Sequence, residues 1–225
     1  MSGDTTPTLW AEHVSWPADA RCIVHVDLDM FFAACHILEQ PELAGVPLVI
    51  GGDPRGRGVV STANYLARAY GVHSAMPAAQ ARRLCPHAVF LRPDGALYRP
   101  RSRRVMEILA ADIAPVLQRV SVDEAFIDAG GLDDPVARAR RAQERIFQET
   151  GLTASVAVAA TRLCSKIGSD LRKPHGFVVV PPGQESIFLA PLAIEKVWGI
   201  GPRTAEALHA AGLTRVGELA AASLA

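Results

Sequence analysis

The sequence has no run of about 20 apolar residues, the length that a helix needs to cross a membrane. No charged and then apolar segment begins the chain, so we expect neither a secretory leader nor a transmembrane helix. The four cysteines are far apart and lack the paired spacing of a metal site: Cys22, Cys35, Cys85 and Cys164. The simplest interpretation is a cytoplasmic protein whose cysteines are buried free thiols.

An excess of charge is also lacking, because 23 Lys and Arg residues balance 23 Asp and Glu residues. Neutrality alone does not indicate a nucleic-acid-binding protein. Arginines nevertheless cluster in two places: Arg99, Arg101, Arg103 and Arg104, and Arg138, Arg140, Arg141 and Arg145. Hydrophobic residues make up 49% of the 225 residues, which suffices for a core and excludes wholesale disorder.

Three acidic residues lie where apolar segments end. Asp27 follows residues 22–26, and Asp123 and Glu124 follow residues 120–122. Each segment is typical of a buried strand, and a carboxylate buried there without a partner would be costly. Carboxylates that converge from separate strands suit hard divalent cations, and two such cations suit phosphoryl transfer. These residues predict a metal-dependent nucleotidyl transferase.

Consecutive side chains of a strand point to opposite faces, so Asp123 and Glu124 can share a site only if a turn separates them. We therefore predict a tight hairpin there. Taken alone, the pair would be an ordinary polar turn, but Asp27 at the end of a central strand favours a site. Asp29 is expected to cap the next helix, and Asp128 to be structural.

Other residues suit phosphate binding. Tyr65 and Arg68 are three positions apart on a predicted helix and share a face, from which both can bond phosphate oxygens. Lys166 lies on a predicted apolar helix and indicates an anion nearby. The alternatives are a solvated helix face for the pair and a lysine that reaches solvent along its own stem.

The predicted order of elements is strand, helix, paired strands, helix and strand, which is a ferredoxin-like arrangement in an α+β fold. The long amphipathic helix is expected over 99–117, and the segment from about 32 to 91 is expected to be an insertion. Residues 175–225 are expected to form a helical unit. Within it, Gly199, Gly201 and Pro202 predict a helix-hairpin-helix turn. Backbone N–H groups at that helix start can hold a DNA phosphate, although an ordinary αα-turn has the same shape.

These residues together resemble the Y-family of translesion DNA polymerases, nearest to its bacterial DNA polymerase IV branch. The resemblance runs from about Cys22 to the end. It rests on ordered segments: residues 25–33, Pro41-Glu42-Leu43, Gly51-Gly52, Tyr65 with Arg68, residues 74–77, residues 121–126, Lys166-Ile167, Lys173-Pro174 and the hairpin at Gly199.

The resemblance implies a tail at 1–20, a ferredoxin-like palm at 21–31 and 92–174, a small α/β fingers insertion at 32–91, and a helical thumb at 175–225. It implies an error-prone DNA-directed DNA polymerase of DNA repair, acting on primer-template DNA and deoxynucleoside triphosphates. Asp27, Asp123, Glu124 and the Leu28 carbonyl would hold two Mg²⁺ ions, with Mn²⁺ as an alternative.

The resemblance also assigns the nucleotide and DNA contacts. Phe32 matches the steric gate that rejects a ribose 2′-hydroxyl, and Phe31 beside it is expected in the same site. Tyr65, Arg68 and Lys166 would hold the triphosphate. Gly199, Gly201, Arg203 and Thr204 would contact the DNA backbone.

The sequence departs from the family at His36, where Glu is usual, and at Thr161-Arg162, where Asn-Lys is usual. The family's basic little-finger domain and its clamp-binding peptide are expected to be absent, although a sliding clamp is a usual partner. We therefore expect a monomer that binds DNA weakly and extends primers distributively. The alternatives are a non-catalytic polymerase-like accessory protein, which would be expected to lose metal acids, and a nucleotide-cyclising enzyme on a similar palm.

Overall fold

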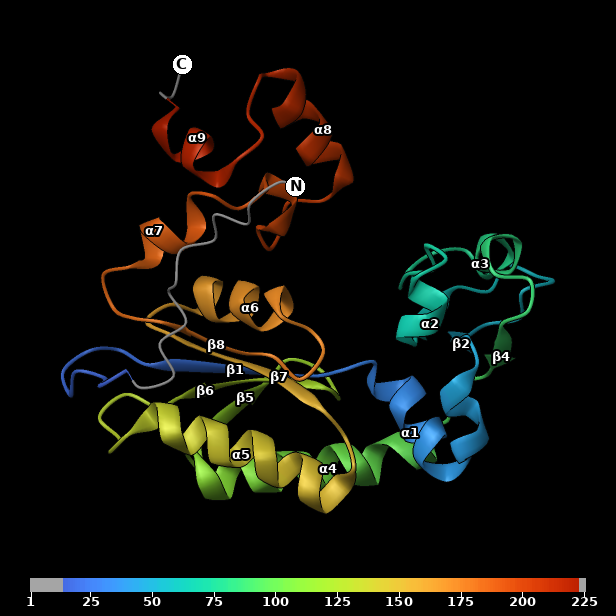
Figure 1. Cartoon of the computed structure of the whole chain (residues 1–225), viewed down its shortest axis with the longest axis horizontal. Coiled ribbons are helices and arrows are strands. Elements are labelled where there is room, and N and C mark those ends of the chain that lie inside the picture. The colour runs from blue at the N-terminus through green and yellow to red at the C-terminus, as the bar shows by residue number, and fades with distance from the viewer. Residues whose placement is uncertain (1–13, 223–225) are drawn as a thin grey trace. The chain divides into compact units, whose positions relative to one another are not determined.

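The computed structural model describes residues 14–222, which form two compact units (Figure 1). The first unit comprises residues up to Asp27, Ile108–Arg145 and residues from Ala154 onward, and the second comprises Leu28–Glu107 and Ile146–Thr153. Most of the expected tail, residues 1–13, lies outside the described part. Within residues 14–222, no helix is both long and apolar enough to span a membrane.

The core of the first unit is a five-stranded sheet with the order β5-β6-β1-β7-β8. The strands are β1 (Ile23–Leu28), β5 (Leu117–Arg119), β6 (Glu124–Asp128), β7 (Ala154–Ala159) and β8 (Phe177–Val180). β6 pairs antiparallel with both β1 and β5, and β7 pairs parallel with β8. Without β8, this is the strand order of the ferredoxin-like fold, which confirms the predicted α+β class.

Two helices flank this sheet on opposite faces, α5 (Pro135–Thr150) and α6 (Arg162–Leu171) (Figure 1). The Ala137 N–H donates to Asp134 Oδ1 at the start of α5, and Gly151 follows the end of the helix with a φ of 69°. α6 packs on β7 and β8 through an apolar cluster that includes Ala157, Ile167 and Val178. The cysteines Cys22, Cys35, Cys85 and Cys164 are free and buried, as expected.

Two expectations about secondary structure were wrong. The long helix α4 spans Gly95–Asp112 rather than 99–117. It ends early because Pro115 lacks an N–H and disfavours helical backbone at the preceding residue, so the chain continues as β5. Residues 177–180, which we expected in a helical unit, form β8 because the apolar run Phe177–Val180 completes the edge of the sheet.

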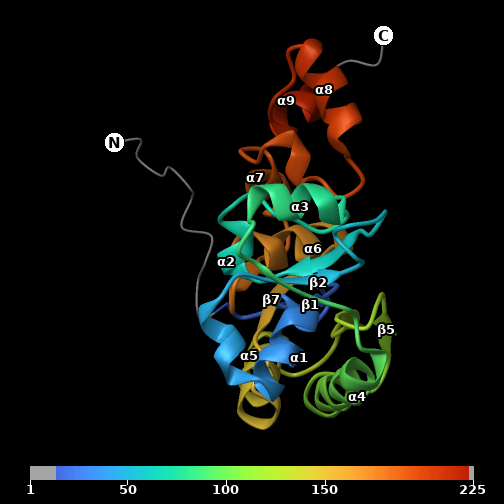
Figure 2. The ribbon, with the colours of Figure 1, turned by 90° about the vertical axis from the view of Figure 1, so that its right-hand side faces the viewer.

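The second unit contains a three-stranded sheet with the order β3-β2-β4: β2 (Leu48–Gly51), β3 (Val60–Ala63) and β4 (Val89–Leu91). Its helices are α1 (Phe31–Glu39), the 3-10 turn Pro41–Gly45, α2 (Tyr65–Arg68) and α3 (Ala78–Leu84). Val49 faces a cluster with α2 and α3, whereas Leu48 and Ile50 face a cluster with α1. Figure 2 shows α3 and α1 on opposite sides of β2. This alternation gives the small α/β insertion that the sequence predicted.

The end of the described chain is helical: α7 (Glu185–Leu189), the 3-10 turn Ile194–Lys196, α8 (Pro202–Ala210) and α9 (Val216–Ala221). Gly199 has a φ of 98°, which glycine adopts without strain, and Gly201 is the N-cap residue before Pro202. These residues form the tight turn that a helix-hairpin-helix requires.

Replacing Asn64 with Ala should destabilise the second unit by about 2–4 kcal/mol. The Asn64 side chain is 2% exposed, accepts hydrogen bonds from the Leu48 and Ala67 N–H groups, and donates to the Val46 carbonyl. The matched control Asp94→Ala removes an exposed cap in the same unit, which accepts from the Ala96 and Leu97 N–H groups, and it should cost only about 1 kcal/mol. Equal losses for the two variants in urea unfolding would contradict this account of Asn64.

Candidate active site

The sheet register brings two of the predicted acids together. Asp27, near the end of β1, is the direct partner of Glu124, the first residue of β6. Residues 120–123 form the turn before β6, and the N–H groups of Val120 and Ser121 both donate to the Glu124 carbonyl. Asp123 therefore lies in the turn and Glu124 in the strand, which confirms the predicted break between them.

Each of the two paired carboxylates lies against a lysine ammonium. Lys173 Nζ is 2.7 Å from Asp27 Oδ1 and 2.8 Å from Asp170 Oδ1. Lys166 Nζ forms an ion pair with Glu124 Oε1. The third acid, Asp123, accepts a hydrogen bond from the Ser121 hydroxyl. Across residues 14–222, no three His, Cys, Asp or Glu side chains are arranged as a ready metal site.

The donor set nevertheless fits hard divalent cations. It consists of carboxylate oxygens, and the two lysine ammoniums already supply positive charge where cations would bind. Burial raises the pKa of Asp27 to about 6, the Lys173 charge opposes that rise, and the Asp123 charge adds to it. Asp27 and Asp123 are thus near enough to repel each other, and a cation between them would relieve that repulsion.

The sequence analysis named Lys173 only as part of the Lys173-Pro174 segment and predicted no role for it. Burial works against its charge, but Asp27 and Asp170 outweigh burial and raise its pKa, so Lys173 stays cationic. The sequence did indicate one partner of Lys173, because Asp170 precedes it by three positions and the two side chains form an ion pair. The contact of Lys173 with Asp27 could not be deduced from the neighbouring sequence, because the two residues are far apart in the chain.

His25 is a second residue that the sequence analysis missed, because it sits in an apolar strand. The ring is fully buried, and Ser169 Oγ lies 2.8 Å from Nδ1. Since the Ser169 hydroxyl donates to the Lys166 carbonyl, the His25 Nδ1–H donates to Oγ. Nε2 then carries a lone pair, 3.4 Å from Glu124 Oε1 and without a hydrogen-bond partner. Burial, followed by the Lys166 charge, lowers the pKa of His25 to about 3, so the ring is neutral.

The departures at Thr161 and Arg162 have structural uses. The Thr161 hydroxyl accepts from the Cys164 N–H and caps α6. Arg162 donates to Gln118 Oε1 at 2.6 Å and lies over the Phe126 ring. Asp128 accepts from the Gly130 N–H, in keeping with a structural role.

The predicted phosphate ligands Tyr65 and Arg68 belong to the second unit and share one face of α2. The Arg68 guanidinium carbon is 5.2 Å from the Tyr65 ring centre, and Arg68 Nε donates to the Ala63 carbonyl. The Tyr65 hydroxyl donates to Asp29 Oδ1 at 3.4 Å. Asp29 does not cap α1, so that prediction was wrong. Met30, with a left-handed backbone at φ 41°, occupies the cap position without a side-chain bond.

The predicted steric gate also belongs to the second unit. Phe32 is half-buried on α1 and stacks on Tyr98 of α4, with ring centres 4.1 Å apart and planes 9° apart. Phe31 is buried, 1% exposed, and packs as an aromatic neighbour of both rings.

In the helical end of the first unit, Gly201, Arg203 and Thr204 are exposed around the start of α8. Nζ of the predicted phosphate ligand Lys166 lies 5.9 Å from the ring centre of Trp198, the residue that precedes Gly199 in the chain. Exposed N-terminal residues on α8 are what contact with a phosphate backbone would require.

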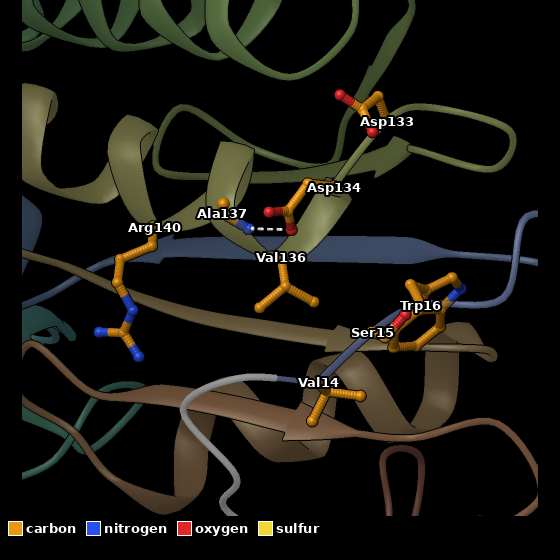
Figure 3. Close-up of a pocket in the computed structure, with 8 residues that line it drawn as sticks. All are labelled: Val14, Ser15, Trp16, Asp133, Asp134, Val136, Ala137 and Arg140. Carbon is orange, nitrogen blue, oxygen red and sulfur yellow. Dashed lines mark hydrogen bonds between the residues drawn. The ribbon is translucent and has the colours of Figure 1, made fainter.

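A cavity of about 720 Å³ lies beside the start of α5 (Figure 3). Its lining includes Trp16, Val136 and Arg140 and none of the predicted site residues. Asp134 in this lining is engaged by the Ala137 N–H, and Arg140 lies over the Phe177 ring. The cavity is therefore separate from the carboxylates.

Comparison with known proteins identifies the family. Residues 26–170 match the impB/mucB/samB family, and residues 182–213 match the IMS family HHH motif. The chain belongs to the impB/mucB/samB family. The predicted helix-hairpin-helix turn at Gly199 falls within the second match.

Proteins named DNA polymerase IV are among its relatives. The chain is 44% identical over 203 residues to one from Halorhodospira halophila, and 45% identical over 210 residues to one from Streptomyces coelicolor. These alignments cover 88% and 90% of this chain but 57% and 43% of the relatives, so the chain spans about half their length.

Solved structures give the same result. DinB from Sulfolobus solfataricus superposes with a TM-score of 0.82 at 30% identity, covering 90% of this chain and 60% of that one. An insertion ternary complex of Dbh DNA polymerase gives 0.79 at 30% identity, covering 90% and 61%. The resemblance to Y-family DNA polymerases is confirmed.

We predict that His25 makes stability sensitive to acid. Its folded pKa of about 3 lies below the usual 6.5, so its contribution is complete above pH 6.5 and is lost as the pH falls toward 3. Between pH 6.5 and 5 the unfolding free energy should drop by about 2 kcal/mol more in the wild type than in His25→Gln. Urea unfolding at both pH values measures this difference, and parallel pH profiles would refute it.

Proposed function

We propose that this chain is the catalytic part of a DNA-directed DNA polymerase that adds deoxynucleotides to a primer 3′-end in translesion synthesis. The observation that carries the proposal is the pairing of Asp27 with Glu124 at the ends of neighbouring strands, with Asp123 in the adjoining turn. Membership of a family whose relatives are named DNA polymerase IV supports it.

The three acids and the Leu28 carbonyl form the metal-binding set of this proposal. When bound there, two Mg²⁺ ions, or Mn²⁺ in their place, supply activation of the primer hydroxyl and neutralisation of the pyrophosphate. Asp27 and Glu124 must first give up their contacts with Lys173 and Lys166. Lys166 is then left without its carboxylate partner, whereas Lys173 keeps its contact with Asp170.

The lysines have a second role after this exchange. An ammonium released from a carboxylate binds the nearest anion, and in a polymerase that anion is the triphosphate of the incoming nucleotide. Lys166 was assigned there from the sequence, and we add Lys173 because its Nζ contacts Asp27 directly. Tyr65 and Arg68 hold triphosphate oxygens from one face of α2, with the guanidinium bonding two oxygens at once.

Phe32 acts in this proposal as the steric gate, with Phe31 behind it. An aromatic ring at the sugar leaves no space for a ribose 2′-hydroxyl, so deoxynucleotides are favoured. At the other end of the chain, Gly199, Gly201, Arg203 and Thr204 hold a DNA phosphate through backbone N–H groups of the turn before α8 and of its first residues, without reading sequence. The related Dbh polymerase is described in a ternary complex, which supports binding of DNA and nucleotide together.

Further features stay predictions: the palm, fingers and thumb bounds, error-prone synthesis, a monomeric state and a sliding clamp as partner. A cytoplasmic location is supported by four free, buried cysteines, which suit a reducing compartment. Weak processivity is supported by the zero formal net charge, because neutralisation of phosphates dominates DNA affinity. A non-catalytic accessory role is disfavoured because all three acids are present.

Metal-dependent incorporation of a deoxynucleotide on a primed template tests the proposal. Asp123→Ala and Glu124→Ala should each lower the rate roughly a thousandfold or more, equivalent to about 4 kcal/mol of transition-state stabilisation. The control Asp128→Asn changes an acid of the same strand that bonds the Gly130 N–H, and it should keep the wild-type rate. Equal activity of Glu124→Ala and Asp128→Asn in folded protein would refute the assignment.

A further inference from the structure

One face of α1 holds Tyr98 of α4 at two points. Phe32 and His36 are four positions apart on α1, so their side chains share a face. The Phe32 ring stacks on the ring of Tyr98, and His36 Nε2 lies 2.9 Å from the Tyr98 hydroxyl oxygen. The Phe32 ring, the Tyr98 ring and the His36 imidazole thus form one connected cluster within the second unit.

The hydrogen bond in this cluster is buried. Tyr98 is 3% exposed and His36 is 9% exposed. Burial lowers the pKa of His36 and raises the pKa of Tyr98, so both groups are neutral near pH 7 and either tautomer of His36 can make the bond. Leaving a buried hydroxyl without a hydrogen-bond partner costs free energy. The bond to His36 therefore restrains the position of the Tyr98 hydroxyl, and with it the position of the ring.

A second link keeps the two helices in register. Arg101, one turn beyond Tyr98 on α4, forms an ion pair with Glu39 at the end of α1 and also donates to the Leu97 carbonyl. The backbone of α4 is therefore held to α1 independently of His36. Loss of the His36 bond would remove one restraint on the Tyr98 ring, and through it on the Phe32 ring stacked upon it, while the helices stay in place.

We propose that His36 is a positioning residue which, through Tyr98, fixes the ring plane of Phe32 and so sets the preference for deoxynucleotides over ribonucleotides. The inference rests on the proposed function, in which Phe32 is the steric gate. A gate discriminates between sugars that differ by one oxygen, so a ring that tilts or shifts by a fraction of an ångström admits more of the wrong sugar. His36 is also where the sequence departs from the glutamate usual in the family.

The test compares kcat/KM for a deoxynucleoside triphosphate with that for the matching ribonucleoside triphosphate. His36→Leu and Tyr98→Phe each remove the bond, and each should lower the deoxy-to-ribo ratio by about tenfold, the equivalent of one hydrogen bond. The change should come mainly from better use of the ribonucleotide. His36→Gln retains an amide that can reach the Tyr98 hydroxyl and should restore most of the ratio. Thermal unfolding verifies that each variant is folded.

A merely structural role for His36 would lower both kcat/KM values together and leave their ratio unchanged. An unchanged ratio in His36→Leu and Tyr98→Phe, with Phe32→Ala still lowering it, would overturn the inference while the polymerase function stands. Absence of any incorporation by the wild type would instead contradict the proposed function and, with it, the selectivity assigned to His36. Aromatic NMR provides the readout without turnover: ring-current shifts between Phe32 and Tyr98 should diminish in His36→Leu, and unchanged shifts would also overturn the inference.

Discussion

Two carboxylates at the ends of neighbouring strands, Asp27 on β1 and Glu124 on β6, each lie against a lysine ammonium. The Asp27 and Glu124 side chains are only 15% and 16% exposed, so a positive partner beside each carboxylate offsets the cost of removing its charge from water. The partners come from α6 and the residues just after it, so the charge balance ties this helix to the ends of the interior strands β1 and β6. Divalent cations would provide the same compensation with more charge. They would release Lys166 from Glu124 and leave Lys173 paired with Asp170 alone, so that both ammonium groups could approach an anionic substrate. The chemistry that we propose depends on this exchange.

α6 is suited to support the exchange because it cannot shift easily. A side chain at Gly168 would meet the Ala157 side chain at 2.8 Å, so the helix approaches β7 as closely as glycine permits. On the same helix, Lys166 reaches Glu124, and Ser169 orients the neutral His25 ring whose Nε2 faces that carboxylate. The site therefore combines a closely packed helix with lysines whose charged ends contact the carboxylates, so cations could replace the ammonium groups without repacking the core.

Local sequence patterns predicted the buried strands that carry the acids and the turn that separates Asp123 from Glu124. Apolar runs that end in acids indicated β1 and β6, and the pleat of a strand required a turn between Asp123 and Glu124. Asp29 was misassigned because the start of α1 depends on a left-handed backbone at Met30, which no residue type there signals. The contacts of Lys173 with Asp27 and of Tyr98 with His36 join residues far apart in the chain, 62 positions in the second case, and only the fold reveals them. β8 was missed because an apolar run of four residues suits a strand or a helix equally.

The most direct test of the central claim is to titrate Mn²⁺ into the protein and measure the bound ion by electron paramagnetic resonance. If the lysines occupy the positions of cations, Asp27→Asn should abolish binding, whereas Lys173→Gln should tighten it because a competing charge has been removed. Binding that is unchanged in Asp27→Asn, or that weakens in Lys173→Gln as much as in Asp27→Asn, would contradict the account.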